Sequence, residues 1–96
     1  MNKPNIRVLN GIVNVKDANL IYNEEQQTYH LIHYDTEIAI IKKDKTIIKL
    51  LKCTPTSTKA IYKLTDYLEI DRNTVKANLK PYYNFVKYKN NMEIDQ

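Results

Sequence analysis

Apolar and polar residues alternate through the first half of the chain in the manner of β-strands. Residues 6–15 (IRVLNGIVNV) are rich in Ile and Val, and Gly11 could mark a bulge or turn between two short strands. The apolar residues 20–22 (LIY) and 28–34 (TYHLIHY) flank a polar stretch, NEEQQ, which predicts a hairpin turn. Both faces of 28–34 are partly apolar, which indicates a central strand.

Two further strands are predicted before residue 53. Residues 38–41 (IAII) predict one strand, and the charged turn KKDK separates it from residues 46–52 (TIIKLLK). The spacing of the apolar residues in 46–52 would also fit a helix. We favour a strand because the run is short and begins with threonine and two β-branched isoleucines. The first half therefore predicts an antiparallel β-meander of four or five strands.

The spacing of apolar residues becomes helical in the second half. A helix is predicted over about 57–69, with an apolar stripe formed by Ala60, Ile61, Leu64 and Leu68. Thr56 or Ser57 is expected to cap its N-terminus, with Pro55 just ahead of the cap.

A second helix is predicted after the turn Asp71-Arg72, with Asn73 as its N-cap. Pro81 has no backbone N–H, and its ring clashes with the preceding helical turn. This helix is therefore expected to end near Lys80, to kink there, or to restart with Pro81 in its first turn.

These patterns predict one domain over residues 1–96, since a chain of this length can bury one modest core. The expected fold class is α+β: an antiparallel β-meander of four or five strands over 1–52, followed by two or three C-terminal helices packed on one face. The helical part spans 56–90, in which YYNFVKYK fits either a third helix or a short strand. Residues 91–96 are predicted to be a frayed tail.

The net charge of +4 is unevenly distributed. Residues 1–52 carry eight Lys or Arg against six Asp or Glu, and residues 53–90 carry seven against three. The last six residues carry two acidic and no basic side chains. The second half is therefore the basic half, and such a bias suits a polyanionic partner such as nucleic acid.

Several kinds of location and chemistry are not expected. No apolar run approaches the roughly 18 residues of a membrane span, and the polar N-terminus with Pro4 does not fit a signal peptide. The single cysteine, Cys53, fits the reducing cytoplasm. His30 and His33 would lie on opposite faces of a strand, so they could not chelate one metal ion together. We expect no catalytic residues, no metal and no cofactor, and hence no enzyme.

Two other features allow alternative interpretations. The hydroxyls of CTPTSTK, residues 53–59, precede a helix and could hold a phosphate, although simple helix capping is the plainer interpretation. Eight tyrosines are present, and tyrosine with interspersed lysine can stack on nucleic-acid bases. Tyrosine is equally suited to a core or to a protein interface.

The stretch TDYLEIDRNTVKANLK, residues 65–80, resembles a helix-turn-helix element. Its four characteristic positions hold Thr65 for the small residue, Glu69 for the turn glycine, and Val75 and Leu79 for two buried apolar residues. The spacing matches the pattern. Thr65 is larger than the usual alanine, and Glu69 lacks the freedom of glycine to adopt positive φ.

The resemblance implies that the second helix approaches the major groove of duplex DNA while its apolar residues face inward. The nucleic-acid-binding residues would then be Lys59, Lys63, Arg72, Asn73, Thr74, Lys76 and Lys80, with Ala77 on the same face. The competing interpretation is an amphipathic helix pair with a solvated basic face.

Residues 20–70 resemble small phage-type proteins of uncharacterised function. The resemblance is carried by HLIHYDTEIAII, a charged turn, a strand, and then TSTKAIYKLTDYL. It implies a viral or mobile-element origin, and thus the host cytoplasm as the location.

We therefore expect a small, non-enzymatic, nucleic-acid-binding regulatory protein with duplex DNA as its partner. The alternative is a viral inhibitor of the anti-CRISPR or anti-restriction type, which would block a host defence or replication enzyme by occluding its surface. A homodimer formed by pairing of exposed sheet edges is a third expectation.

Overall fold

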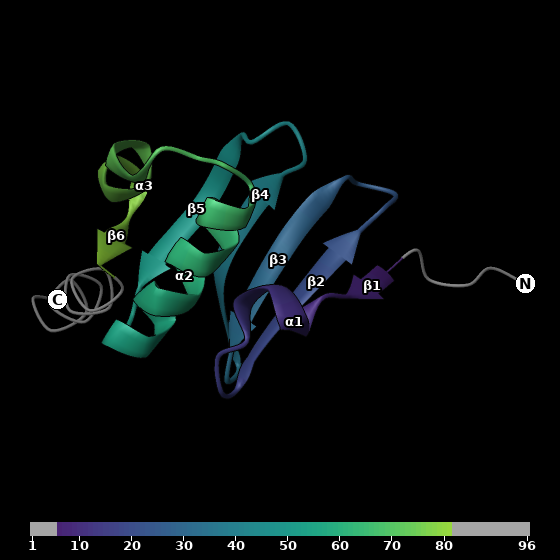
Figure 1. Cartoon of the computed structure of the whole chain (residues 1–96), viewed down its shortest axis with the longest axis horizontal. Helices are drawn as coiled ribbons and strands as arrows, with labels where there is room; N and C mark the ends of the chain where they lie inside the picture. The colour runs from purple at the N-terminus through teal and green to yellow at the C-terminus, as the bar shows by residue number, and fades with distance from the viewer. Residues whose placement is uncertain (1–5, 82–96) are drawn as a thin grey trace, which may run out of the picture.

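The computed structural model of the chain describes residues 6–81. Within them lies one sheet whose strands follow the order of the sequence (Figure 1). The first five strands pair antiparallel, and the short last strand pairs parallel with the fifth. The strands are β1 (Ile6–Val8), β2 (Ala18–Asn23), β3 (Thr28–His33), β4 (Thr36–Lys42), β5 (Ile47–Lys52) and β6 (Lys80–Pro81).

The helices are α1 (Asn10–Val13), α2 (Pro55–Tyr67) and α3 (Arg72–Asn78). Figure 1 shows α1 and α2 on the same face of the sheet, with α3 beside the outer edge of β5. The predicted fold class, an α+β protein with an antiparallel meander followed by C-terminal helices, is confirmed. The strand interpretation of residues 46–52 is also confirmed, since β5 occupies this segment.

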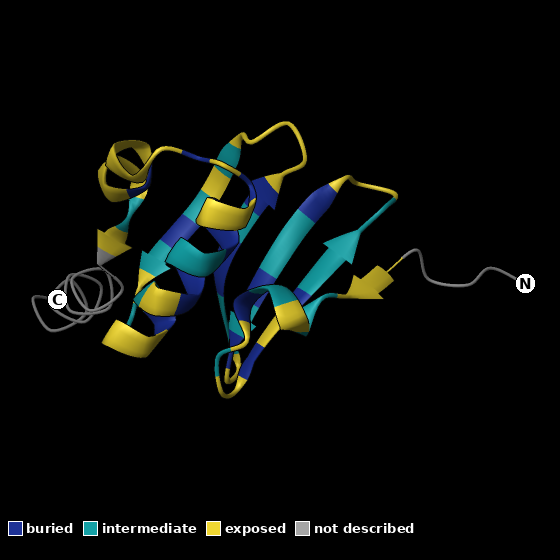
Figure 2. Ribbon diagram, viewed as in Figure 1, coloured by how far each residue is buried: buried dark blue, intermediate teal, exposed yellow. Residues whose placement is uncertain are grey.

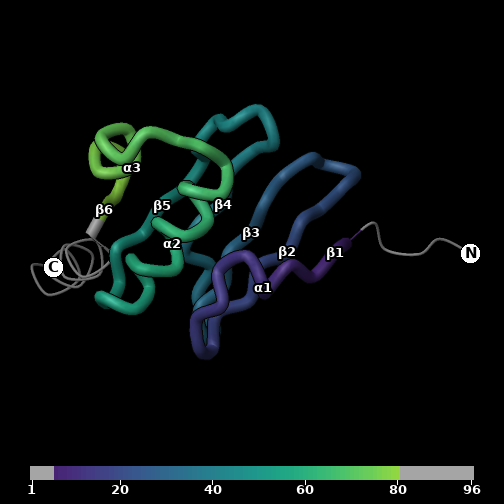
Figure 3. Tube along the Cα trace, in the orientation of Figure 1, coloured from purple at the N-terminus to yellow at the C-terminus, as the bar shows by residue number. Residues whose placement is uncertain are grey.

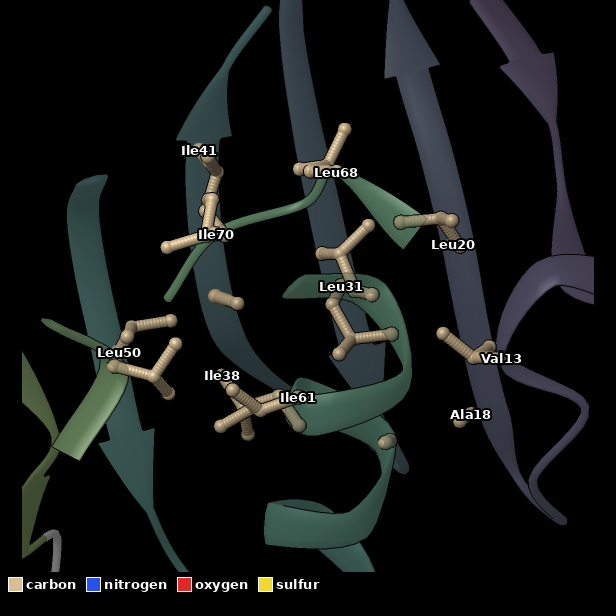
Figure 4. Packing of buried hydrophobic residues seen from close by; sticks show 14 residues of the cluster. Val13, Ala18, Leu20, Leu31, Ile38, Ile41, Leu50, Ile61, Leu68 and Ile70 are labelled. Atoms are coloured by element: carbon tan, nitrogen blue, oxygen red, sulfur yellow. The ribbon is translucent and has the colours of Figure 1, made fainter. Parts of the chain in front are cut away.

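The core is built on one row of side chains that crosses four strands. Leu20, Leu31, Ala39 and Leu50 are consecutive partners in the strand register, and all four are buried. The apolar stripe of α2 covers this row, and Figure 4 shows Ile61 and Leu68 lying over the strands. Burial of each leucine of this row contributes about 1.5–3 kcal/mol, so this contact stabilises the fold.

The segment 6–15 was expected to form two strands, and the second of these is wrong. The chain leaves β1 at Val8 and forms the short helix α1. The side-chain oxygen of Asn10 accepts a hydrogen bond from the Leu20 N–H at 2.8 Å. This backbone donor of β2 therefore has a partner although the expected second strand is absent at residues 10–13. The helix then inserts Val13 fully into the core.

Both predicted helix starts lie two residues too late. The N-cap of α2 is Thr54 rather than Thr56 or Ser57, because proline occupies the first helical turn without loss of a hydrogen bond. The N-cap of α3 is Asp71 rather than Asn73, since its carboxylate accepts from the Thr74 N–H at 3.2 Å.

Within the expected helical part 56–90, α3 ends close to the predicted end near Lys80. The helix ends at Asn78, and Lys80–Pro81 pair with β5 as β6. The chain therefore does not continue as a helix at the proline, where the missing N–H would have interrupted it. The alternatives for YYNFVKYK and the expected tail at 91–96 lie outside the described residues.

A buried side-chain contact ties the start of α2 to the end of β3. The Nδ1 atom of His33 lies 2.6 Å from Ser57 Oγ, and the two residues are only 5% and 1% exposed. Thr54 donates its hydroxyl to Ser57 Oγ at 3.1 Å and accepts the Ser57 N–H at the same distance. The capping interpretation of CTPTSTK therefore accounts for the hydroxyls of Thr54 and Ser57.

Replacement of Ser57 by alanine should lower the free energy of unfolding by about 1–3 kcal/mol, because it leaves a buried imidazole nitrogen without its partner. Urea denaturation measures the change. Thr56→Ala removes an exposed hydroxyl from the adjacent residue and should change stability by less than about 0.5 kcal/mol. Equal effects of the two substitutions would contradict this assignment.

Candidate nucleic-acid interface

The turn between α2 and α3 is closed by two backbone hydrogen bonds. The Glu69 N–H donates to the Asp66 carbonyl at 3.0 Å, and the Ile70 N–H donates to the Thr65 carbonyl at 2.9 Å. This pair of bonds defines a Schellman motif, which requires a left-handed residue directly after the helix cap. Glu69 supplies it with φ of 60°. The position that holds glycine in the helix-turn-helix pattern therefore has the backbone conformation for which glycine is preferred.

The other characteristic positions of the pattern face inward. Thr65 and Val75 are fully buried, and Leu79 is half-buried against the core. Thr65 fits where the two helices meet because its hydroxyl donates to the Tyr62 carbonyl of the preceding turn at 3.2 Å. The polar atom that distinguishes threonine from alanine is thus satisfied within the helix.

The outward side of α3 is polar and basic. Figure 2 shows α3 as largely exposed, and its exposed residues include Asn73, Thr74, Lys76 and Ala77. The seven residues of the helix contain no acidic side chain. The Asn78 side chain donates to the Thr74 carbonyl at 2.8 Å and closes the last turn, so it is engaged locally.

Arg72 was expected to contact the DNA backbone, but its guanidinium is already paired. Its Nη2 lies 2.7 Å from Asp66 Oδ2 and its Nε lies 3.3 Å from Asp66 Oδ1, while its Cζ lies 5.0 Å from the centre of the Tyr62 ring. The hydrogen bond from Arg72 lowers the pKa of the Asp66 carboxyl, which keeps this partner charged. A phosphate would have to compete with Asp66 for Arg72.

The remaining predicted lysines are spread over three elements. Lys76 lies in the last turn of α3, and Lys80 is exposed in β6, next along the chain. Lys59 and Lys63 lie one turn apart on α2, the first exposed and the second half-buried. Lys59 is about two turns from the end of α2, so it stands apart from the α3 group.

One arrangement of side chains was missed by the sequence analysis. His30 has its Nδ1 atom 2.9 Å from Glu37 Oε2 and its Nε2 atom 2.7 Å from Thr28 Oγ1. A hydroxyl, an imidazole and a carboxylate in this order could transfer a proton. Thr28 is only 6% exposed, however, so its hydroxyl is not accessible to a substrate. The Thr-x-His spacing in the sequence could have predicted the contact between Thr28 and His30, because it places both side chains on one face of a strand.

Cys53 is the single cysteine of the chain, and it is half-buried. Burial raises the pKa of its thiol, against a smaller opposing effect of Lys49, so the reactive thiolate is disfavoured. His33 lies on the opposite face of β3 from His30, as expected, and its Nδ1 is bonded to Ser57. No group of three or more potential metal-ligating residues occurs within residues 6–81.

Comparison with known proteins adds no relative: the chain matches no family model, no curated protein sequence and no solved structure. Within the described residues, none of the helices combines the length and the apolar character needed to cross a membrane.

Replacement of Glu69 by glycine should raise the free energy of unfolding by about 0.5–1 kcal/mol, because glycine adopts the left-handed conformation without steric cost. Thermal denaturation measures the change. Glu69→Ala removes the same carboxylate but keeps the β-carbon, and it should give no such gain. Equal stabilisation by alanine would show that charge, rather than backbone conformation, governs this turn.

Proposed function

We propose that this protein binds duplex DNA without catalysis and inserts α3 into the major groove. The observation that carries the proposal is the placement of α3: Val75 anchors the helix in the core, while Asn73, Thr74 and Lys76 face outward. The left-handed backbone of Glu69, at the position that holds glycine in the helix-turn-helix pattern, supports the proposal.

The size and charge of α3 suit this role. An α-helix with its side chains is about 10–12 Å across, which fits the major groove of about 12 Å, and the seven residues of α3 make a helix about 10 Å long. The N-terminal residues of a recognition helix contact base edges, which assigns Asn73 and Thr74 to the bases. Lys76 and Lys80 would neutralise phosphates and supply affinity that depends on salt.

Lys76→Glu combined with Lys80→Glu should abolish binding to a generic duplex at 50 mM salt, because two phosphate contacts become repulsive. A mobility-shift titration of wild type and variant at about 50 and 200 mM salt measures this, and wild-type affinity should fall steeply with salt. Lys16→Glu combined with Lys45→Glu changes the net charge equally at exposed positions outside the interface and serves as the control. Duplex binding that is absent in wild type at low salt, or equal in the two double variants, would refute the proposal.

Replacement of Asp66 by asparagine should strengthen duplex binding, because it releases the Arg72 guanidinium to contact a phosphate. The plot of log affinity against log salt concentration should steepen by about one unit. Asp35→Asn removes the same charge from an exposed turn between β3 and β4, and it should leave the slope unchanged. An identical response to both substitutions would show that Arg72 does not reach the DNA.

A further inference from the structure

A hollow of about 440 Å³ lies at the end of the sheet where two hairpin turns meet the end of α2. We call it the tyrosine hollow, after Tyr22, Tyr29 and Tyr67, which line it together with the charged residues Arg7, Glu24 and Lys43. The Lys43 N–H donates to the Gln27 carbonyl at 2.8 Å and joins the turn after β4 to the turn after β2. Figure 3 shows these two turns side by side. The walls of the hollow are therefore held by backbone contacts.

The three phenol rings come from three different elements. Tyr22 and Tyr29 are direct partners on β2 and β3, with ring centres 4.7 Å apart and ring planes tilted by 47°. Tyr67 is the last residue of α2 and is 55% exposed. Burial raises the pKa of Tyr29, and the nearby phenol groups of Tyr67 and Tyr22 raise it further.

The charges around the rings decide which class of ligand the hollow fits. Arg7 and Lys43 are cationic, and one of these charges is balanced by Glu24, whose Oε1 lies 2.5 Å from Arg7 Nε. Three aromatic rings alone could hold a quaternary ammonium group, but a surplus positive charge opposes a cation. A neutral sugar would leave that charge without a partner. A planar ring attached to an anionic group uses both features of the site.

We propose that the tyrosine hollow binds a nucleotide, with the base stacked on the tyrosine rings and the phosphate held by Lys43, next to the ion pair of Arg7 and Glu24. A hollow of this size lies within the range of about 300–1,000 Å³ that small-molecule sites occupy. The nucleotide is either free or an unstacked unit of a single strand, since both present the same base and phosphate. The site shares no residue with α3, so the proposal does not rest on duplex binding.

The test uses the whole chain and three probes: thymidine 5′-monophosphate, thymidine, and a deoxythymidine octamer. Amide NMR titration should shift the resonances of the residues that line the tyrosine hollow. Tyr67→Ala should weaken binding of the monophosphate at least about fivefold, whereas Tyr67→Phe keeps the ring and should stay within about twofold of wild type. Tyr67 is exposed, so its removal leaves the core intact.

Lys43→Glu tests the phosphate contact separately. It should weaken binding of the monophosphate at least about threefold and leave the affinity for thymidine unchanged. Tighter binding of the octamer than of the monophosphate would identify a single strand as the source of the nucleotide, and equal binding would identify the free nucleotide. Either result supports the site.

The proposal is overturned if neither the monophosphate nor the octamer shifts these resonances at millimolar concentration. It is also overturned if Tyr67→Ala and Lys43→Glu both bind as wild type does. The variant with Lys76→Glu and Lys80→Glu should bind the monophosphate normally, whereas the Tyr67 variants should bind duplex normally. Failure of the hollow and failure of α3 as a DNA-binding helix are therefore separate results.

Discussion

The packing of α2 across the row Leu20, Leu31, Ala39 and Leu50 is the contact on which the rest of the structure depends. The apolar stripe of α2 can cover this row in only one rotation of the helix, and the bond between Ser57 and His33 fixes where along the sheet the helix begins. The length of α2 then determines where the helix ends over the sheet. The turn into α3 and the ring of Tyr67 both follow from that end point, so both candidate sites depend on the same core.

Most of the fold could be predicted from local patterns, because strand alternation and helical spacing express burial on one face. The pattern failed where a distant contact decided the outcome. α1 is too short to show a period, and it depends on the bond between Asn10 and Leu20, ten positions along the chain. The true caps, Thr54 and Asp71, were missed because several hydroxyl and carboxyl residues adjoin each helix start and the sequence ranks them poorly.

The candidate sites also differ in how far they could be predicted from local sequence patterns. The exposure of Asn73, Thr74 and Lys76 follows from the spacing around Val75, so it was accessible to sequence reasoning. The pairing of Arg72 with Asp66 crosses a turn whose geometry depends on the left-handed backbone conformation of Glu69. A glutamate in the sequence does not predict this conformation. The grouping of tyrosines in the hollow needs the strand register and the end of α2 together, and neither is local.

The last turn of α2 contributes side chains both to the surface around α3 and to the tyrosine hollow. Asp66 and Tyr67 are adjacent, so their side chains leave the helix about 100° apart. Asp66 meets Arg72 at the start of α3, whereas Tyr67 joins the hollow beside Tyr29. One helix end thus controls the charge available to α3 and completes the aromatic wall of the hollow. Because different side chains perform these two tasks, each surface can be altered chemically while the shared core that positions both stays the same.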